Sequence, residues 1–302
     1  MKGAIIRTSH WGSAFVSIIT LALSLVGGAE ASIEPRVKSR SVVVIDETNA
    51  AVLYSKKADV VGPIASITKL MTALVMLEGG QPLEELIEIT AGDRDLRYGS
   101  GSRLVVGSRL SRGDLLHLAL MSSENRAAHA LGRSYPGGLS AFVRAMNAKA
   151  KALGMRTTRF VDPTGLSSNN VSSASDLVKL VMAAGEQSLI RQYSTSERHV
   201  VSVGRQSIEF RNTNTLVAKA DWDIKVQKTG YTSEAGQCLV MATTIRDRPI
   251  VMVFLNSFGK LTRVAEARRI RKWMEQGVPA SQLASGTGAG APSKRAVVGA
   301  SD

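Results

Sequence analysis

The sequence predicts an α/β fold in which one antiparallel sheet, built from both ends of the chain, is flanked by helices and carries an inserted helical subdomain. Two observations predict it. β-Branched, strand-like runs lie near residue 41 and again after residue 224, and the stretch between, from about 81 to 215, has mostly helical and loop-like patterns. Strands from the two ends can share one sheet only if the middle packs against it, so we expect a cleft where the two parts meet.

The expected strands fall into two groups. Ser41 to Glu47 is rich in β-branched residues, and Ala50 to Ser55 returns after a short polar turn, which predicts a hairpin. The second group comprises Ile224 to Val226, Gln237 to Thr244 and Pro249 to Leu255. These runs are short and bounded by turn residues, as strands of one sheet should be.

The first expected helix spans about Ser66 to Glu78. Its apolar residues recur with the 3.6-residue period of a helix that faces a core, and Gly79 and Gly80 end it. The other expected helices are Gly113 to Met121, Asn125 to Arg133, Gly138 to Leu153, Ser173 to Ala184 and Thr262 to Glu275.

Residues 1–31 have the pattern of a secretory signal peptide. Lys2 and Arg7 precede an uncharged apolar run over 14–28, and small residues then lead to an expected cleavage after Ala31. The alternative is a transmembrane anchor, but the run is shorter than the ~20 residues that a spanning helix needs. We therefore expect an exported, periplasmic protein with no stable membrane anchor.

The remaining chain is expected to form one folded domain over 32–276, followed by a flexible tail at 277–302 that is rich in Gly, Ala and Ser. The 302 residues include 44% hydrophobic and 21% charged residues, a balance typical of soluble globular proteins. The net charge of +13 favours anionic partners. Because the cations are scattered and only 5% of the residues are aromatic, a nucleic-acid groove is not expected.

Several classes of site are disfavoured. The single cysteine, Cys238, closes no disulfide within the chain and lies in a strand-like run, which predicts a buried structural thiol. No His-x-x-x-His or paired-cysteine spacing predicts a metal site, and no cofactor is expected. A Ser-His-Asp hydrolase is a poor fit, since beyond the leader the histidines are only His117, His129 and His199, and no Gly-x-Ser-x-Gly turn precedes a helix.

Ser66 and Lys69 form the first candidate catalytic pair. Residues three apart share one face of a helix, and a serine in the first turn lies near unpaired backbone N–H groups. A lysine there could take the serine's proton if burial or another cation lowered its pKa. Ser-x-x-Lys occurs again at Ser257 and Lys260, where an internal glycine and a preceding strand argue against a shared helical face.

Two further motifs follow in order. Ser123 and Asn125 lie two residues apart at a break between expected helices, although Ser-x-Asn also recurs at Ser167/Asn169 and Ser168/Asn170. Lys228-Thr229-Gly230 occurs once, on an expected strand, and its glycine lets a ligand approach the backbone closely.

The order Ser-x-x-Lys, Ser-x-Asn, Lys-Thr-Gly resembles that of penicillin-interacting serine enzymes. From about Ser41 to Gln276 the chain is similar to low-molecular-mass penicillin-binding proteins, the serine DD-peptidases of the cell wall, whose fold is β-lactamase-like. The segments "SSENRAAHALGRSYPGG", "FVDPTGLSSNN" and "KTGYTSEAGQCLVMAT" resemble the D-alanyl-D-alanine endopeptidase branch of the penicillin-binding protein 7 type. Carboxypeptidase relatives more often have Gly or Asp where this chain has Glu124, and they usually add a C-terminal domain and anchor.

The resemblance implies a role for each motif residue. Peptidoglycan stem peptides are the implied substrates, and β-lactam antibiotics the implied covalent inhibitors. The implied catalytic residues are Ser66 as nucleophile, Lys69 as its base and Ser123 as proton relay. The implied substrate-binding residues are Asn125, Lys228, Thr229, Gly230 and Tyr231. The backbone N–H groups of Ser66 and Tyr231 are the implied oxyanion hole.

Three alternatives to an endopeptidase stay open. A DD-carboxypeptidase would release terminal D-Ala with the same residues. A class A β-lactamase needs a glutamate to activate the deacylating water, and the segment after the second motif offers only Asp162 and Asp176. A non-enzymatic wall-binding protein need not retain three complete motifs.

Overall fold

The computed structural model describes residues 1, 34–94, 101–204, 206–259 and 261–277. Apart from Met1 and Gly277, the expected leader and the expected tail lie outside these residues. No helix within the described ranges is long and apolar enough to cross a membrane.

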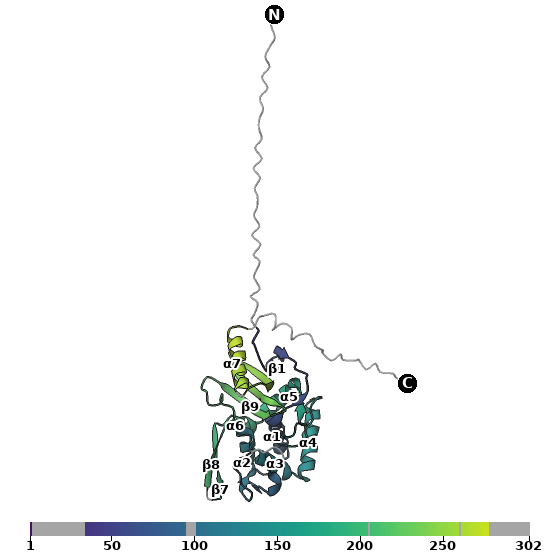
Figure 1. Cartoon of the computed structure of the whole chain (residues 1–302), viewed down its shortest axis with the longest axis vertical. Helices are drawn as coiled ribbons and strands as arrows, with labels where there is room; N and C mark the ends of the chain where they lie inside the picture. Colours follow the sequence, from purple (N-terminus) through teal and green to yellow (C-terminus); the bar gives the residue numbers. More distant parts are fainter. Residues whose placement is uncertain (2–33, 95–100, 205, 260, 278–302) are drawn as a thin grey trace, which may run out of the picture. The chain divides into compact units, whose positions relative to one another are not determined.

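The central sheet contains strands from both ends of the chain, which confirms the predicted fold class (Figure 1). Its order is β2-β1-β11-β10-β9, and every neighbouring pair is antiparallel. Strand β1 from the first hairpin pairs with β11, so Val43 lies opposite Val253. The strands are β1 (Ser41–Asp46), β2 (Ala51–Lys56), β9 (Asp223–Thr232), β10 (Gly236–Ile245) and β11 (Arg248–Ser257).

Both faces of the sheet are covered, which explains why its strands are apolar at successive positions. Side chains alternate between the faces of a strand, and Val42 and Val44 enter a different core cluster from Val43 and Ile45. Helix α7 (Thr262–Glu275) covers the Val42 face, while α5 (Ala174–Gly185) packs on the other.

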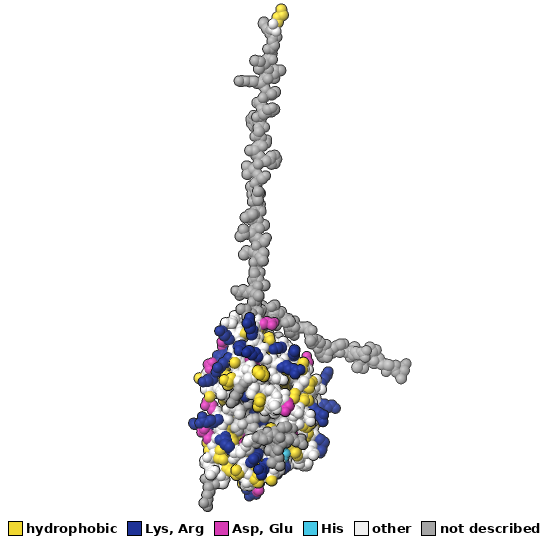
Figure 2. All heavy atoms as spheres, viewed as in Figure 1, with side chains coloured by type: hydrophobic (Ala, Val, Ile, Leu, Met, Phe, Trp, Pro, Cys, Tyr) yellow, Lys and Arg dark blue, Asp and Glu magenta, His cyan; other side chains and the backbone are white. Residues whose placement is uncertain are grey.

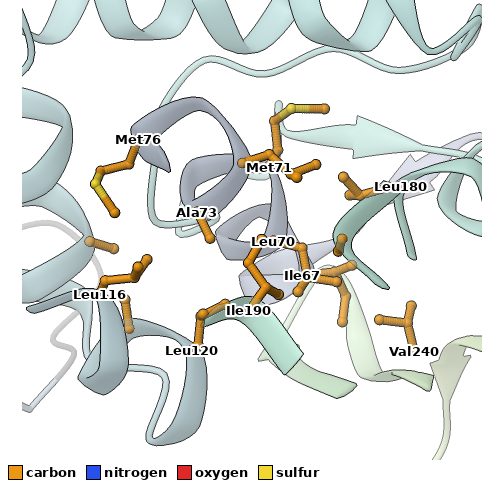
Figure 3. Packing of buried hydrophobic residues seen from close by; sticks show 14 of the residues in the cluster. Ile67, Leu70, Met71, Ala73, Met76, Leu116, Leu120, Leu180, Ile190 and Val240 are labelled. Atoms are coloured by element: carbon orange, nitrogen blue, oxygen red, sulfur yellow. The ribbon is translucent and has the colours of Figure 1, made fainter. Parts of the chain in front are cut away.

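Helix α1 (Thr68–Glu78) lies at the centre of the helical part and is buried from Thr68 to Met76. Figure 3 shows Leu70, Met71 and Ala73 of α1 among side chains of the surrounding helices and of β10. A helix enclosed in this way is held in position along most of its length, so residues at its start are held too. The helices around it are α2 (Arg112–Met121), α3 (Asn125–Arg133), α4 (Gly138–Ala152), α5 and α6 (Ser188–Thr195).

The first expected helix begins later than predicted. Ser66 belongs to a short 3-10 turn, η1 (Ala65–Ile67), and the α-helix starts at Thr68. The preceding Ala65 has a φ of 47°, which is outside the α-helical region, and its carbonyl accepts a hydrogen bond from Thr68 Oγ1 at 2.8 Å. The apolar period continues through this turn, so the pattern alone could not reveal it.

The segment from 81 to 215 is also less helical than predicted. It contains a hairpin of β7 (Arg198–Val203) and β8 (Gln206–Arg211), whose side chains are largely exposed or half-buried. Because polar residues occupy the exposed positions, the sequence pattern did not predict these strands. The remaining short elements are β3 (Gly62–Pro63) paired with β6 (Val171–Ser172), β4 (Leu86–Glu88) paired with β5 (Arg109–Ser111), and the 3-10 turn η2 (Ala91–Asp93).

The surface agrees with the scattered cations in the sequence. On the face that Figure 2 shows, Lys and Arg side chains are spread among acidic, polar and apolar ones.

Cys238 is buried and unpaired, and burial raises the pKa of its thiol to about 11. The thiol is therefore protonated at neutral pH, as expected of a structural cysteine.

Candidate active site

Ser66 lies in η1, directly before α1, with its side chain turned toward Lys69 one turn further on. The distance from Lys69 Nζ to Ser66 Oγ is 2.9 Å. The turn places the hydroxyl at the N-terminal end of a buried helix, where unpaired backbone N–H groups stabilise developing negative charge. Ser66 and Lys69, the first candidate catalytic pair, are therefore in contact.

The Lys69 amine contacts two further oxygens besides Ser66. Nζ donates to Asn125 Oδ1 at 2.7 Å and to the Thr164 carbonyl at 2.6 Å. These two oxygens can only accept, whereas the Ser66 hydroxyl can donate or accept. A neutral amine has two N–H donors and one lone pair, so this arrangement leaves the lone pair for the Ser66 proton.

The electrostatics of the site favour that neutral form. The Lys69 side chain is fully buried, and desolvation lowers its pKa to about 7, although the carboxylates of Asp162 and Glu124 oppose the shift. Lys228 is also fully buried, and its pKa lies well below the usual value because of desolvation and the charges of Lys69 and Arg263.

Ser123 and Asn125 lie where α2 ends and α3 begins. Ser123 has a φ of 62°, an uncommon conformation for a residue other than glycine, which lets the chain turn sharply between the two helices. The Glu124 side chain caps α3 by accepting from the Arg126 N–H at 3.1 Å. This turn brings Asn125 to Lys69 and Ser123 to the same cavity as Ser66.

Lys228, Thr229, Gly230 and Tyr231 lie near the end of β9, the edge strand of the sheet that faces Ser66. A Cβ atom on Gly230 would lie 3.0 Å from the Ser66 backbone nitrogen, so glycine lets the strand approach this closely without crowding the turn. The Lys228 amine donates to the Thr229 carbonyl at 2.9 Å.

These elements enclose a cavity of about 500 Å³ between the sheet and the helices. Ser66, Ser123 and Asn125 line it from the helical part, and Thr229, Gly230 and Tyr231 line it from β9. The predicted cleft is thus present where the two parts meet. Lys69 and Lys228 are completely buried behind its wall, where each contacts residues that line it.

Comparisons with known proteins show the family to which the chain belongs. A family model described as D-alanyl-D-alanine carboxypeptidase covers residues 29–259. The chain is 48% identical over 274 residues to a D-alanyl-D-alanine endopeptidase of Pseudomonas aeruginosa, covering 87% of this chain and 88% of that one. An endopeptidase of Escherichia coli is 45% identical over 285 residues, covering 89% and 92%. The chain belongs to this family of DD-peptidases.

A solved structure gives the same result for the fold. The crystal structure of a Streptomyces DD-transpeptidase superposes with a TM-score of 0.75 at 25% identity, covering 81% of this chain and 99% of that one. The protein described here is thus a serine DD-peptidase with the fold expected from its motifs.

The other candidate residues lie elsewhere in the DD-peptidase. The Ser257 hydroxyl is buried against Ser39, and Lys260 lies outside the described residues. His117 stacks between Tyr193 and His199, with ring centroids 4.3 and 4.1 Å apart. The described residues contain no group of three or more His, Cys, Asp or Glu side chains that could hold a metal ion.

Sequence reasoning missed the loop that supports Lys69. The sequence marks Asp162 only as a residue of a segment that lacks the glutamate of a class A β-lactamase. In the structure its carboxylate organises the loop from 162 to 170. Oδ1 accepts from the N–H groups of Thr164 and Gly165, each at 2.7 Å. Oδ2 accepts from Asn170 Nδ2 at 2.9 Å. The loop thereby presents the Thr164 carbonyl to Lys69, a contact that no side-chain motif could signal.

Two further residues in the cavity were also missed. Thr213 Oγ1 lies 2.6 Å from Thr229 Oγ1, and Arg263 donates to the Gly230 carbonyl at 3.0 Å. Both line the cavity, so Arg263 adds a cation beside β9. Arg263 is one of several arginines on the last helix, and no motif in the sequence distinguishes it from the others.

Proposed function

We propose that this DD-peptidase is an endopeptidase that hydrolyses the D-alanyl cross-links between peptidoglycan stem peptides through an acyl-enzyme on Ser66. The observation that carries the proposal is the contact of the buried Lys69 amine with Ser66 Oγ at 2.9 Å, with two acceptor oxygens occupying its other positions. The P. aeruginosa and E. coli relatives, both named endopeptidases, support the choice of reaction.

Acylation begins at Ser66. Neutral Lys69 takes the hydroxyl proton while Oγ attacks the carbonyl carbon of the D-Ala residue. The negative charge on the carbonyl oxygen is stabilised by the backbone N–H groups of Ser66 and Tyr231, which act as the oxyanion hole. The close approach of Gly230 to the Ser66 nitrogen supports this pairing of donors, since it brings β9 beside the turn.

The leaving amine then needs a proton. Ser123 lines the cavity with Ser66 and relays a proton to that amine with the help of Lys228, whose pKa desolvation and nearby cations hold well below the usual lysine value. Asn125 holds Lys69 and the substrate amide, and Lys228 and Thr229 bind the carboxylate side of the leaving group. Water finally hydrolyses the acyl-enzyme and restores Ser66.

The same site supports covalent capture of β-lactam antibiotics. A β-lactam presents a strained amide carbonyl to Ser66, and its leaving nitrogen stays attached to the acyl group, so it remains in the cavity. These compounds should therefore inhibit the enzyme by occupying Ser66.

We expect purified protein that lacks residues 1–31 to convert cross-linked muropeptide dimers to monomers faster than it trims pentapeptides to tetrapeptides. The reason is that an endopeptidase must admit a second peptide strand on the leaving-group side. Chromatography of digested peptidoglycan measures both reactions, with Ser66→Ala as the inactive control. Release of D-Ala from pentapeptides with the dimers left intact would identify a carboxypeptidase instead.

Export to the periplasm is the second part of the proposal, based on the leader pattern in residues 1–31. Mass spectrometry of the protein made in a bacterial host should find a new N-terminus at or near Ser32. A chain that keeps Met1 and fractionates with membranes would contradict it.

A further inference from the structure

A second cavity adjoins the active site at the end of the sheet. Its volume is about 530 Å³, and Tyr231 and Ser233 line both this cavity and the one that contains Ser66. The second cavity lies beyond the end of β9, where β10 begins and β11 ends, with Gln237 and Asn256 among its walls. A substrate that extends along β9 past Tyr231 therefore enters it.

Two aromatic side chains on the wall of this cavity are unusually exposed. Phe258 is 90% exposed and Tyr231 is 61% exposed, although both are large and apolar enough to favour burial. Exposed apolar groups that border a groove are typical of binding sites. Flat aromatic faces bind ligands that present C–H groups. The side-chain amide of Asn256 and the N–H groups of the Gln237 amide, whose oxygen accepts from Arg263, can bind polar substituents.

The charge of the walls distinguishes the possible ligands. All the described residues that line the second cavity are uncharged, whereas Glu234 and Arg263 line the active-site cavity. A stem peptide carries carboxylate and ammonium groups, which lose hydration on burial, and none of the described residues that line this cavity offers an opposite charge. Arg263 lies behind the wall, where its guanidinium donates to Gln237 Oε1. A neutral ligand with apolar ring faces and amide substituents matches the walls better.

We propose that this cavity binds an N-acetylated sugar of the glycan strand that bears the stem peptide cleaved at Ser66. The inference rests on the proposed function, because the sugar reaches the cavity only as part of that substrate. The ring stacks on Phe258 and Tyr231, and the acetamido group contacts Asn256 and Gln237. The enzyme thus holds its polymer at two places, which favours intact peptidoglycan over free peptides.

Phe258→Ala tests the subsite because Phe258 has no role in the proposed mechanism and does not line the cavity that contains Ser66. The variant, the wild type and Phe258→Trp are each assayed on two cross-linked dimers, one with disaccharides attached and one whose sugars an amidase has removed. We expect Phe258→Ala to lose about tenfold in kcat/KM on the sugar-bearing dimer, the usual cost of truncating an aromatic anchor. Hydrolysis of the sugar-free dimer and acylation by a small β-lactam should be unchanged, and Phe258→Trp should retain activity on both dimers.

The control is Leu86→Ala, which removes another exposed apolar side chain, 62% exposed, from β4. It should leave both rates unchanged. An equal loss on the two dimers in Phe258→Ala would place peptide in the cavity and overturn the proposal, as would no loss on either. If the wild type cleaves neither dimer but still binds β-lactam, the proposed endopeptidase function itself fails, which distinguishes that failure from failure of the subsite.

Discussion

Lys69→Arg should lower the rate of acylation by about 10²–10⁴, the contribution of a positioned general base. The mutation keeps a basic side chain of similar length at the position, yet a guanidinium stays protonated at all relevant pH values and cannot take the Ser66 proton. Burial is what makes the lysine a base, since its pKa falls to about 7. Stopped-flow or gel measurement of labelling by a fluorescent penicillin gives the rate.

The pH dependence of the wild type provides an independent check. Below pH 7 the protonated fraction of Lys69 rises, so the acylation rate should fall about tenfold per pH unit well below the pKa.

The matched control for Lys69→Arg is Lys151→Arg on the exposed surface of α4, which should acylate at the wild-type rate. A Lys69→Arg variant with normal acylation would show that another group removes the proton.

Gly165→Ala should both destabilise the protein and abolish rapid acylation. A Cβ atom at this position would lie 2.0 Å from the Ala65 carbonyl oxygen and 2.8 Å from Thr68 Oγ1, inside the turn that holds Ser66. Gly165 also has a φ of 79°, which disfavours any other residue. Overpacking and the left-handed backbone together cost about 2–5 kcal/mol in the free energy of unfolding.

Gly154→Ala separates the effect of backbone strain from that of overpacking. Gly154 has a similar φ of 68°, but no heavy atom lies within 4 Å of its added Cβ. This variant should lose only about 1–2 kcal/mol from backbone strain and acylate at the wild-type rate. Thermal unfolding and penicillin labelling measure both variants. If Gly165→Ala lost no more stability and no more acylation rate than Gly154→Ala, the close packing of the loop from 162 to 170 on the turn that contains Ser66 would contribute to neither.

The sequence was sufficient to predict the sheet and six of the twelve residues that line the cavity. Strands that are apolar at successive positions, such as the one containing Val42 and Val43, belong to a sheet covered on both faces. Ser66, Lys69 and Asn125 were singled out because the order of the three motifs resembles that of penicillin-interacting serine enzymes, and in the structure Lys69 contacts both Ser66 and Asn125. Their catalytic roles remain part of the proposal.

The missed features share a physical cause. The Thr164 carbonyl contacts Lys69 through the backbone, so no residue type marks it, and Asp162 acts by accepting hydrogen bonds within a loop rather than by a fixed spacing to the serine. The start of α1 was misplaced because the backbone at Ala65 departs from helical values while the apolar period continues. Periodicity reports which side chains are buried and says nothing of backbone contacts between segments distant in sequence.

Covalent labelling of Ser66 tests the central claim most directly. Intact-mass spectrometry after treatment with a β-lactam should show one adduct per chain, and peptide mapping should place it on Ser66, while Ser66→Ala should show none. An adduct that persists in Ser66→Ala, or one that maps to Ser257, would contradict the assignment of the nucleophile.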